Sequence, residues 1–529
     1  MNTITTNDQC GLDLCKRKEV VIIGNGPSAI ILSYILSGHI PYWNGCPVSN
    51  DYLNIKLEQY VKDTSLLEQD LEFLSDGLEG RSRNPVSLLI DNLLHPDADL
   101  GAHLQSKIKW RHDPSLSIDH ICIGRGGVGG VWNKTTSKQL QTISMADWME
   151  LPNYPMSTFR QQRRAARCNS LTNNQETTTT TTTTNNENQF GRATYDEVHS
   201  YYIHYVKRNR LTNYFRNGYE ITSIERVCID APYYDDVNEE IRTPQPLWEI
   251  RGYNEQDKTP FVLHAKYVVL ATGTPQKITR PLGIIGESAS QSFTYTNLHD
   301  IEDLINKKRL TNNSKPLLVV GCGLTAVDIL LLCQQYLIPV LHVFRRAIDD
   351  HELVLNQLPA NIFPEYERIR ELIRQSTSTT TSMSSSVSSS SSSQWSYQCY
   401  PQSEIISITE DGTVHIRNLR THITTDCDIS FVAKLTGADV TIPFLSSSNT
   451  KKYNGLQINP YTYECIDYEN VYALGPLAGD KLVRFLQGGA LACAASLFKK
   501  HRQASSNNNN NNNNRRLSFS VTSRIRVAS

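Results

Sequence analysis

The chain has 529 residues, enough for two or three domains of roughly 150 residues each. Hydrophobic residues make up 39% of it, and its formal net charge of -1 gives no field that would draw it to nucleic acid or an anionic membrane. The start, MNTITTNDQC, has no apolar signal segment, and no stretch reaches the ~18 apolar residues of a membrane span.

The 12 cysteines follow no paired metal-ligand spacing. Cys10 and Cys15 are the closest pair, and no matching pair with histidine follows them, so we expect no metal site. Free thiols are typical of a reducing intracellular compartment, and we therefore expect the protein in the cytoplasm.

Three polar tracts without periodicity cannot pack a core, and we expect them to be disordered. They are rich in Thr and Asn at about 170–188, in Ser and Thr at about 376–393, and in Asn within the C-terminal tail 504–529. Residues 1–17 are expected to form a disordered N-terminal tail.

The first predicted strand, Val20–Ile23, leads through a G-x-G-x-x-A loop into a predicted helix, Pro27–Ser37. Small residues in such a loop permit a tight turn, close approach of a pyrophosphate and close packing of the helix. The helix N-terminus then offers free N–H groups to the phosphates. The flanking strand and helix favour dinucleotide binding over an ordinary glycine turn. The residues expected at the nucleotide are Gly24, Gly26, Pro27, Ser28 and Ala29.

An acidic residue that binds the ribose hydroxyls is expected about 20 residues further on. The segment Pro41–Asn50 contains no Asp or Glu, and the nearby acids Asp51 and Glu58 do not end an obvious strand. Either ribose recognition comes from elsewhere in the chain, or the site is degraded.

A short predicted strand, His120–Ile123, precedes a glycine-rich segment that ends at Trp132. Glycines let the backbone approach a planar ligand, and the indole of Trp132 could wall a ring, although a flexible loop with a core tryptophan is the alternative. A further buried strand, Tyr267–Ala271, runs into the sequence Ala271, Thr272 and Gly273. A strand that ends in this way is a common point at which the chain crosses between two nucleotide-binding domains.

The second loop of this kind follows the predicted strand Leu317–Val320 and opens the predicted helix Leu324–Tyr336. The next strand, Val340–Phe344, is followed by two arginines where an acid would select NAD. Guanidinium groups suit the 2′-phosphate of NADP, so this site is predicted to bind NADP(H); the alternative is a solvated charge pair at a strand end. The residues expected at NADP are Gly321, Gly323, Thr325, Ala326, Arg345 and Arg346.

Near the C-terminus a strand, Val471–Leu474, runs into Gly475, Gly479 and Asp480. The Asp480 carboxylate could hold the ribityl chain of a flavin, and it could also cap a helix. Continuous Val, Ile and Leu runs without alternation suit parallel strands covered on both faces. We therefore expect an α/β protein with two Rossmann-like domains, which bind FAD and NADP(H).

Long segments of the chain resemble the oxidative stress-induced growth inhibitor proteins, which are themselves similar to flavin-containing monooxygenases. The resemblance rests on VVIIGNGPSAIILSYILSGHIPYW from Val20, LEFLSDGLEGRSRNPVSLLIDNLL from Leu71, LLVVGCGLTAVDIL from Leu317 and YALGPLAGDKLVRFLQGGALA from Tyr472. It implies an FAD domain of residues 18–275 and 431–503, with an NADP(H) domain inserted at 276–430. It also implies that Gly129, Gly130 and Trp132 lie by the flavin.

The resemblance further implies monooxygenase-type activity, restraint of cell growth, and control of apoptosis or differentiation under oxidative stress. Our first hypothesis is an enzyme that uses FAD, NADPH and molecular oxygen on a small-molecule substrate, with no side chain assigned as catalytic. An NADPH oxidase or a disulfide reductase acting through Cys10 and Cys15 is an alternative. A second alternative is a regulatory protein that keeps the fold but catalyses no reaction. The absence of the acid expected at the ribose favours this alternative.

Overall fold

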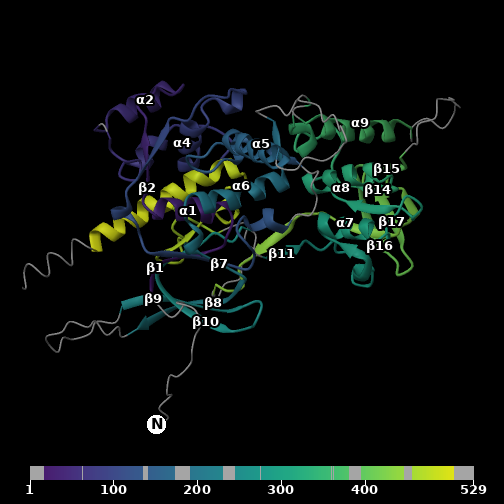
Figure 1. The fold of residues 1–529 in the computed structure, drawn as a ribbon. Helices are drawn as coiled ribbons and strands as arrows, with labels where there is room; N and C mark the ends of the chain where they lie inside the picture. Colours follow the sequence, from purple (N-terminus) through teal and green to yellow (C-terminus); the bar gives the residue numbers. More distant parts are fainter. Residues whose placement is uncertain are drawn as a thin grey trace, which may run out of the picture. The chain divides into compact units, whose positions relative to one another are not determined.

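The computed structural model describes residues 17–61, 63–134, 141–172, 191–229, 245–273, 276–358, 360, 363–379, 395–445 and 456–504. They form two compact units (Figure 1): unit 1 is Met1–Pro275 with Ile442–Ser529, and unit 2 is Gln276–Thr441. Most of the segments expected to be disordered lie outside the described residues. Two helices nevertheless continue into the first residues of the expected insertions, α5 (Met156–Thr172) and α9 (Pro364–Thr379). In α9 the Ser376 hydroxyl accepts a hydrogen bond from the Cys399 N–H at 3.1 Å, which ties this part of the tract to a strand.

Unit 1 is built on a seven-stranded sheet in the order β7-β4-β1-β10-β9-β8, with β21 also paired to β10. The strand β1 is parallel to β4 and β10, whereas β8, β9 and β10 form an antiparallel meander. Val20–Ile23 are at most 2% exposed, as expected of a strand covered on both faces. The bounds are β1 Lys18–Ile23, β4 His120–Gly124, β7 Phe215–Asn217, β8 Tyr219–Ile229, β9 Gln245–Asn254, β10 Pro260–Leu270 and β21 Val471–Ala473.

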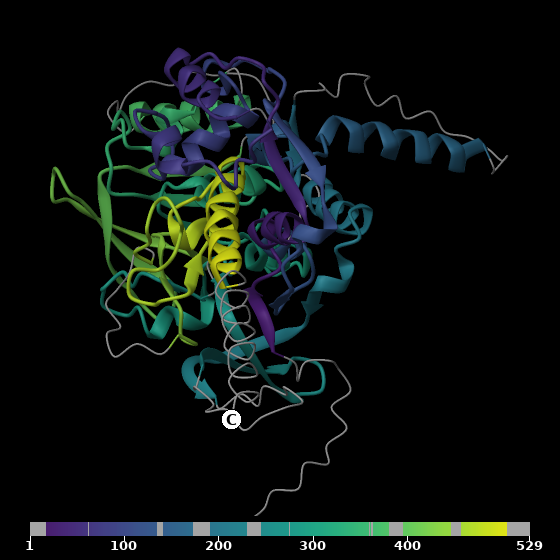
Figure 2. The ribbon, with the colours of Figure 1, turned by 90° about the vertical axis from the view of Figure 1, so that its left-hand side faces the viewer.

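Helix α1 (Pro27–Leu36) is buried at nearly every position and belongs to the main core of unit 1. A C-terminal helix over residues 486–504 contributes to the same core and lies beside α1 in both views (Figures 1 and 2). Other helices of unit 1 are α2 (Asp51–Glu58), α3 (Leu71–Ser75), α4 (Pro85–Leu94) and α6 (Tyr195–Arg208). The strands β2 (His39–Trp43) and β3 (Ile108–His112) pair antiparallel in a separate ribbon, as do β5 (Gln141–Met145) and β6 (Arg192–Thr194).

Unit 2 has a five-stranded parallel sheet in the order β12-β19-β13-β14-β15, with a three-stranded antiparallel sheet, β16-β17-β18, and a two-stranded ribbon, β11-β20. Its helices besides α9 are α7 (Leu298–Asn306) and α8 (Leu324–Gln335). The strand bounds are β11 Gln276–Thr279, β12 Thr294–Tyr295, β13 Leu317–Val320, β14 Val340–Val343, β15 Tyr397–Tyr400, β16 Ser403–Ile408, β17 Thr413–Asn418, β18 Thr424–Asp428, β19 Phe431–Lys434 and β20 Ala438–Thr441.

The α/β class predicted from the sequence is confirmed. The expected second boundary at 430/431 falls before β19, which pairs with β13 and so belongs to unit 2; the compact unit ends at Thr441 instead. Within the described part of the chain, no helix has the length and apolar character needed to cross a membrane.

Candidate nucleotide sites

The first glycine loop lies where three parallel strands of unit 1 end. Gly24 follows β1 with φ of 130°, and its N–H donates a 2.7 Å hydrogen bond to the Ile123 carbonyl of β4. A Cβ at Gly24 would lie 2.2 Å from the carbonyl oxygen of Ala271, which follows β10. The carboxyl edge of a parallel sheet is where such folds bind their ligands. The structure thus brings Gly24, Ala271 and Thr272 together.

The N-terminus of α1 is open to an anion. Gly26 is its N-cap residue with no side-chain hydrogen bond, and the first turn carries no acidic residue. Pro27, at the first position of the helix, has no N–H, so it adds no unpaired donor to the first turn. The N–H groups and positive dipole end of such a helix suit phosphate oxygens. Gly475 reaches the same helix, because a Cβ there would lie 2.8 Å from Ser28 Oγ.

The glycine-rich segment after β4 packs directly on this loop. The N–H of Gly129 donates to the Asn25 carbonyl at 2.8 Å, and a Cβ on Gly130 would lie 2.9 Å from the Cα of Gly26. The Trp132 ring lies 4.9 Å from the ring of Tyr195 on α6, measured between centroids. The structure therefore gathers the predicted phosphate loop and the predicted flavin segment at one place.

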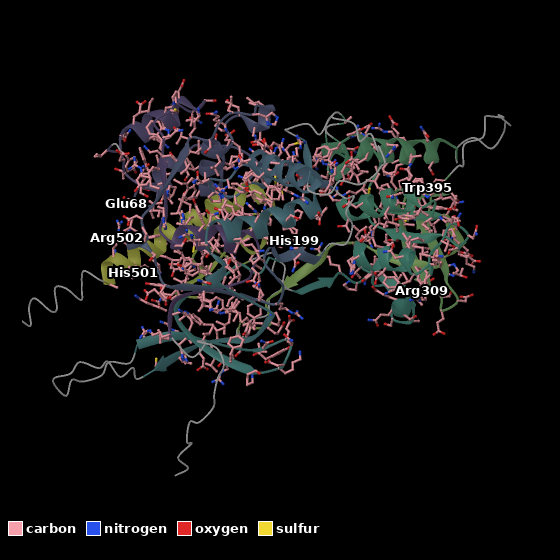
Figure 3. The ribbon with its side chains drawn as sticks, in the orientation of Figure 1. Glu68, His199, Arg309, Trp395, His501 and Arg502 are labelled. Atoms are coloured by element: carbon pink, nitrogen blue, oxygen red, sulfur yellow. The ribbon has the colours of Figure 1, made fainter. Side chains whose placement is uncertain are left out.

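The buried polar atoms near these loops that have no hydrogen-bond partner among the described residues include Asn25 Oδ1, Thr272 Oγ1 and His199 Nε2. His199, labelled in Figure 3, is on α6, and its Cδ2 would lie 3.3 Å from a Cβ on Gly129. A buried polar group without a partner costs about 1–3 kcal/mol, so such atoms are expected to face a ligand. Together with the glycines that leave room for it, these atoms fit a dinucleotide such as FAD.

Asp480 has a different environment from the one the sequence suggested. It is 1% exposed, and burial raises the pKa of its carboxyl group. Its Oδ1 accepts from Asn84 at 2.9 Å and Ser82 at 3.3 Å, and its Oδ2 accepts from Tyr463 at 2.7 Å and Ser87 at 3.1 Å. These protein groups surround the carboxylate on both oxygens, so it is not directed to a ribityl chain. Asp480 instead ties the C-terminal segment to α4, and the helix cap proposed for it is not formed, since Leu482 is the N-cap residue of the turn that follows.

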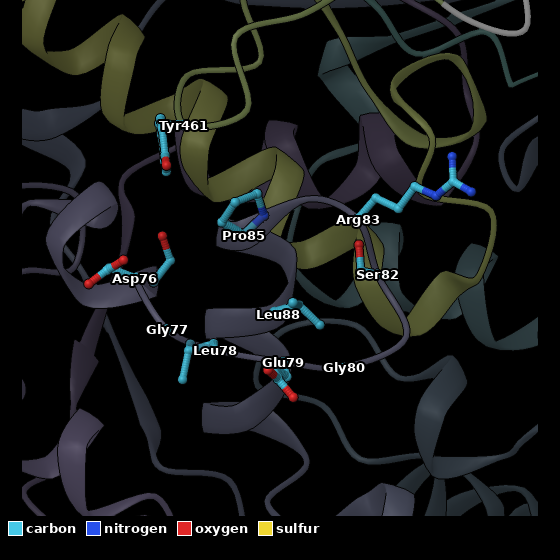
Figure 4. Close-up of a pocket in the computed structure, with 11 residues that line it drawn as sticks. Asp76, Gly77, Leu78, Glu79, Gly80, Ser82, Arg83, Pro85, Leu88 and Tyr461 are labelled. Carbon is cyan, nitrogen blue, oxygen red and sulfur yellow. The ribbon is translucent and has the colours of Figure 1, made fainter.

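A hollow of about 400 Å³ opens next to this network (Figure 4). The Ser82 hydroxyl, which binds Asp480, is part of its wall, and Leu88 and Tyr461 give it apolar surface. Asp76 and Arg83 line it as well, but their charged ends point away from each other. The volume falls within the range of small-molecule sites.

The position of the residue expected to bind the ribose depends on which strand lies next to β1 in the sheet, and not on its distance from the glycine loop along the sequence. The segment where spacing predicts this residue, Pro41–Asn50, begins within β2, which pairs with β3 in a ribbon separate from the sheet of β1. Two strands flank β1: β10, which leads to Ala271 at the first glycine loop, and β4, which is followed by Arg125. The position that usually carries an acid therefore carries an arginine.

The second glycine loop lies between the ends of two strands, β19 and β14, and β14 holds both backbone polar groups of Gly321. Gly321 follows β13 with φ of 109°, and a Cβ there would lie 2.5 Å from the Leu435 carbonyl oxygen. Its N–H donates to the Val343 carbonyl at 2.9 Å. Its own carbonyl lies 2.8 Å from Nε2 of His342, the residue before Val343 on β14. Gly323 is the uncapped N-cap residue of α8, and a Cβ there would meet no heavy atom of the described residues within 4 Å.

His342 was missed by sequence reasoning, because it looks like one more strand residue. It is 0% exposed, and burial lowers its pKa to about 4, so the ring is neutral at pH 7. A carbonyl can only accept, so Nε2 carries the proton, and Nδ1, 2.8 Å from the hydroxyl oxygen of Tyr397, accepts from it. This tautomer fixes the Gly321 carbonyl.

The two predicted NADP arginines differ in their surroundings. Arg346 bonds to Asp350 at 2.9 Å and pairs with Glu352 at 2.5 Å. The Arg345 side chain is 70% exposed, and its contact is with Glu404 at 4.0 Å, a carboxylate that Arg417 already holds at 2.5 Å. Arg345 is therefore the better placed of the two to receive a phosphate, and both assignments stay predictions.

Two human proteins are similar to this chain over most of its length. Oxidative stress-induced growth inhibitor 1 is 34% identical over 507 residues, which is 93% of this chain and 98% of that protein. Oxidative stress-induced growth inhibitor 2 is 36% identical over 510 residues, covering 91% of this chain and 94% of that protein. No family model matches the chain.

Solved structures share the fold at low sequence identity. Ornithine hydroxylase from Pseudomonas aeruginosa has a TM-score of 0.52 at 11% identity and covers 92% of this chain and 99% of its own. The ornithine N-hydroxylase of Kutzneria sp. 744, solved with reduced FAD, NADP+ and L-ornithine, has a TM-score of 0.52 at 12% identity, with 92% and 100% covered. Bacillithiol disulfide reductase from Bacillus cereus has a TM-score of 0.51 at 13% identity, with the same coverage. The chain therefore has a mixed α/β fold that resembles flavin-dependent monooxygenases and reductases.

Proposed function

The chain belongs to the family of oxidative stress-induced growth inhibitors, and on that premise we propose that it is a flavin-dependent monooxygenase that uses NADPH. Unit 1 would bind FAD and unit 2 would bind NADP(H). The observation that carries this proposal is the pair of strand–glycine loop–helix turns, each with an uncapped helix N-terminus. The polar atoms of Asn25, Thr272 and His199 that have no partner in the described part of the chain support a ligand at the first of them.

When bound, the two cofactors supply hydride transfer and the activation of oxygen, and the protein supplies binding and orientation. The N-terminus of α1 would hold the pyrophosphate of FAD, and that of α8 the phosphates of NADP(H). Arg345 would receive the 2′-phosphate. The hollow beside Ser82 is our candidate for the site of a small-molecule substrate.

The biological role is proposed from the names of the relatives. We infer that the protein restrains cell growth in the response to oxidative stress, with effects on apoptosis or differentiation, and that it acts in the cytoplasm.

A non-catalytic regulator is the second candidate, because Arg125 stands where an acid would bind the ribose of FAD. The thiol-based alternative depends on Cys10 and Cys15, which lie outside the described residues.

The test is the absorption spectrum of the purified full chain after incubation with FAD, before and after addition of NADPH. We expect a bound-flavin spectrum that NADPH bleaches without oxygen, and NADPH oxidation in air. A protein that binds no flavin would contradict the proposal. A protein that binds flavin but shows no NADPH oxidation with any acceptor would favour the regulator.

A further inference from the structure

A group of polar side chains lies beyond the carboxyl ends of β4 and β7, at the edge of the first glycine loop. The two strands pair in parallel, with Gly124 opposite Asn217. The Asn25 side-chain amide donates to the Gly126 carbonyl at 2.7 Å and to Asn217 Oδ1 at 2.8 Å. Asn25 is 4% exposed, and these two hydrogen bonds fix its N–H groups. Its side-chain oxygen therefore points in the opposite direction, and this buried oxygen has no partner among the described residues.

Two carboxylates reach the same place from other parts of unit 1. Arg125, directly after β4, pairs with Glu220 of β8, and its Nε lies 3.2 Å from Glu255 Oε1. The Glu255 N–H donates to the Gly218 carbonyl at 2.7 Å, which holds this residue beside the end of β7. The Glu220 and Glu255 side chains are 23% and 36% exposed, so a ligand can reach them.

In this class of fold, the ribose of the dinucleotide lies at the end of the strand next to the first strand, here the end of β4. Arginine has no acceptor, whereas a ribose hydroxyl is best held by a carboxylate. Arg125 Nε pairs with Glu220 Oε2 and Glu255 Oε1, and each carboxylate has a second oxygen that can accept a hydrogen bond. A 2′-phosphate in the same place would meet two negative charges.

We propose that Glu220 and Glu255, held at the end of β4 by Arg125, accept hydrogen bonds from the ribose hydroxyls of the adenosine half of FAD. They take the place of the acid that the sequence lacks, and they select a ribose without a 2′-phosphate. This inference rests on the proposed binding of FAD to unit 1.

The experiment measures how ADP and 2′,3′-dideoxy-ADP, which lacks both hydroxyls, displace FAD from the full-length protein. Flavin fluorescence reports the first site alone, so nucleotide binding in unit 2 does not interfere. We expect the dideoxy analogue to compete about tenfold more weakly than ADP with the unmodified protein. In the double variant Glu220→Ala/Glu255→Ala, this preference should fall to near one.

The matched control is Glu225→Ala, an exposed acid further along β8, which should keep the full preference. Because the preference is a ratio within one protein, a general loss of stability does not mimic the result. If the alanine pair does not fold, the isosteric Glu220→Gln/Glu255→Gln pair is measured, with a reduced preference expected.

Equal competition by ADP and the dideoxy analogue in the unmodified protein would overturn the inference and leave FAD binding intact. A preference that survives in the folded variants would overturn it as well. Failure of the unmodified protein to bind FAD would instead overturn the proposed function, and the inference with it.

Discussion

His342 shows how one side chain can position a whole loop. Its Nε2–H faces the Gly321 carbonyl, while the next residue, Val343, accepts the Gly321 N–H. Both polar groups of this glycine are thus held by consecutive residues of β14, the strand that leads to Arg345. The same strand therefore holds the glycine loop and leads to Arg345, and His342 is expected to position the loop.

His342→Asn and His342→Gln separate this role from general packing. The amide nitrogen of Gln can occupy the place of Nε2, whereas that of Asn falls short of the Gly321 carbonyl. We expect His342→Asn to weaken NADP+ binding about tenfold, and His342→Gln to restore most of it. NADP+ titration measures this, and His415→Gln, on β17 of the same unit, is the control. Equal losses in both His342 variants would argue for a packing role alone.

Arg345 and Arg346 should make unequal contributions to the choice of cofactor. Arg346 pairs with Asp350 and Glu352, whereas the ion pair of Arg345 with Glu404 is long, at 4.0 Å. We expect Arg345→Ala to weaken NADPH binding about tenfold with little effect on NADH, because only NADPH carries the 2′-phosphate. Arg346→Ala should have a smaller effect. Dissociation constants for both nucleotides would decide this, and a larger loss in Arg346→Ala would reverse the assignment.

At the scale of the elements, Gly321 and Gly323 of the second loop are expected to differ in role: one is required by the fold and the other by the ligand. A side chain at Gly321 meets backbone 2.5 Å away and a φ of 109°, so Gly321→Ala should destabilise unit 2 by several kcal/mol. A side chain at Gly323 meets no atom of the described chain within 4 Å. We therefore expect Gly323→Ala to fold with nearly unchanged stability and to lose NADP+ binding, because only the ligand needs that space. Thermal unfolding and NADP+ titration of both variants test this, and NADP+ binding retained by Gly323→Ala would place the phosphates elsewhere.

The glycine loops and their flanking elements were predictable, because the strand, the turn and the helix are contiguous in the chain. The predicted strand Leu317–Val320 is β13, and the predicted helix from Leu324 is α8. What could not be predicted is which distant segments meet there. One of the two partners of β1 is β4, which the chain reaches only after a long excursion through the β2–β3 ribbon. Spacing along the sequence therefore misplaced the residue that lies at the ribose.

Asp480 shows the same limit at the C-terminus. The Gly-Asp sequence suggested a flavin ligand, but the donors that occupy its carboxylate come from Ser82, Asn84, Ser87 and Tyr463. Three of them lie almost four hundred residues earlier in the chain. Spacing along the sequence carries no signal for such a contact.

For the whole molecule, buried histidines predict a response to acid. Burial lowers the pKa of His342 to about 4 from 6.5, so the unfolded chain binds a proton in a range where the folded chain does not. The stability due to the neutral ring is complete above pH 6.5 and is lost as the pH falls towards 4. The loss between pH 7 and pH 5 should be about 2 kcal/mol in unit 2.

Hydrogen exchange of β13 and β14 at the two pH values, corrected for intrinsic rates, measures this loss, and His342→Gln should reduce it. Unit 1 is less suitable for the measurement. Its buried His120, with a pKa of about 4, acts in the same direction, but burial raises the pKa of Glu150 to about 8, so that this group favours the folded state at low pH. An unchanged pH dependence in His342→Gln would show that other groups control it.

The ribbon of β11 and β20 has a consequence for how such a protein can be altered. These strands are the first and last of unit 2, and they pair antiparallel from Gln276 opposite Thr441 to Thr279 opposite Ala438. The chain therefore enters and leaves the unit at neighbouring points. A deletion between them, closed by a two-residue turn, would end in a hairpin and need no long linker. The same junction would admit a related domain, so that evolution, or an engineer, could exchange as a whole the unit that we propose to bind NADP(H).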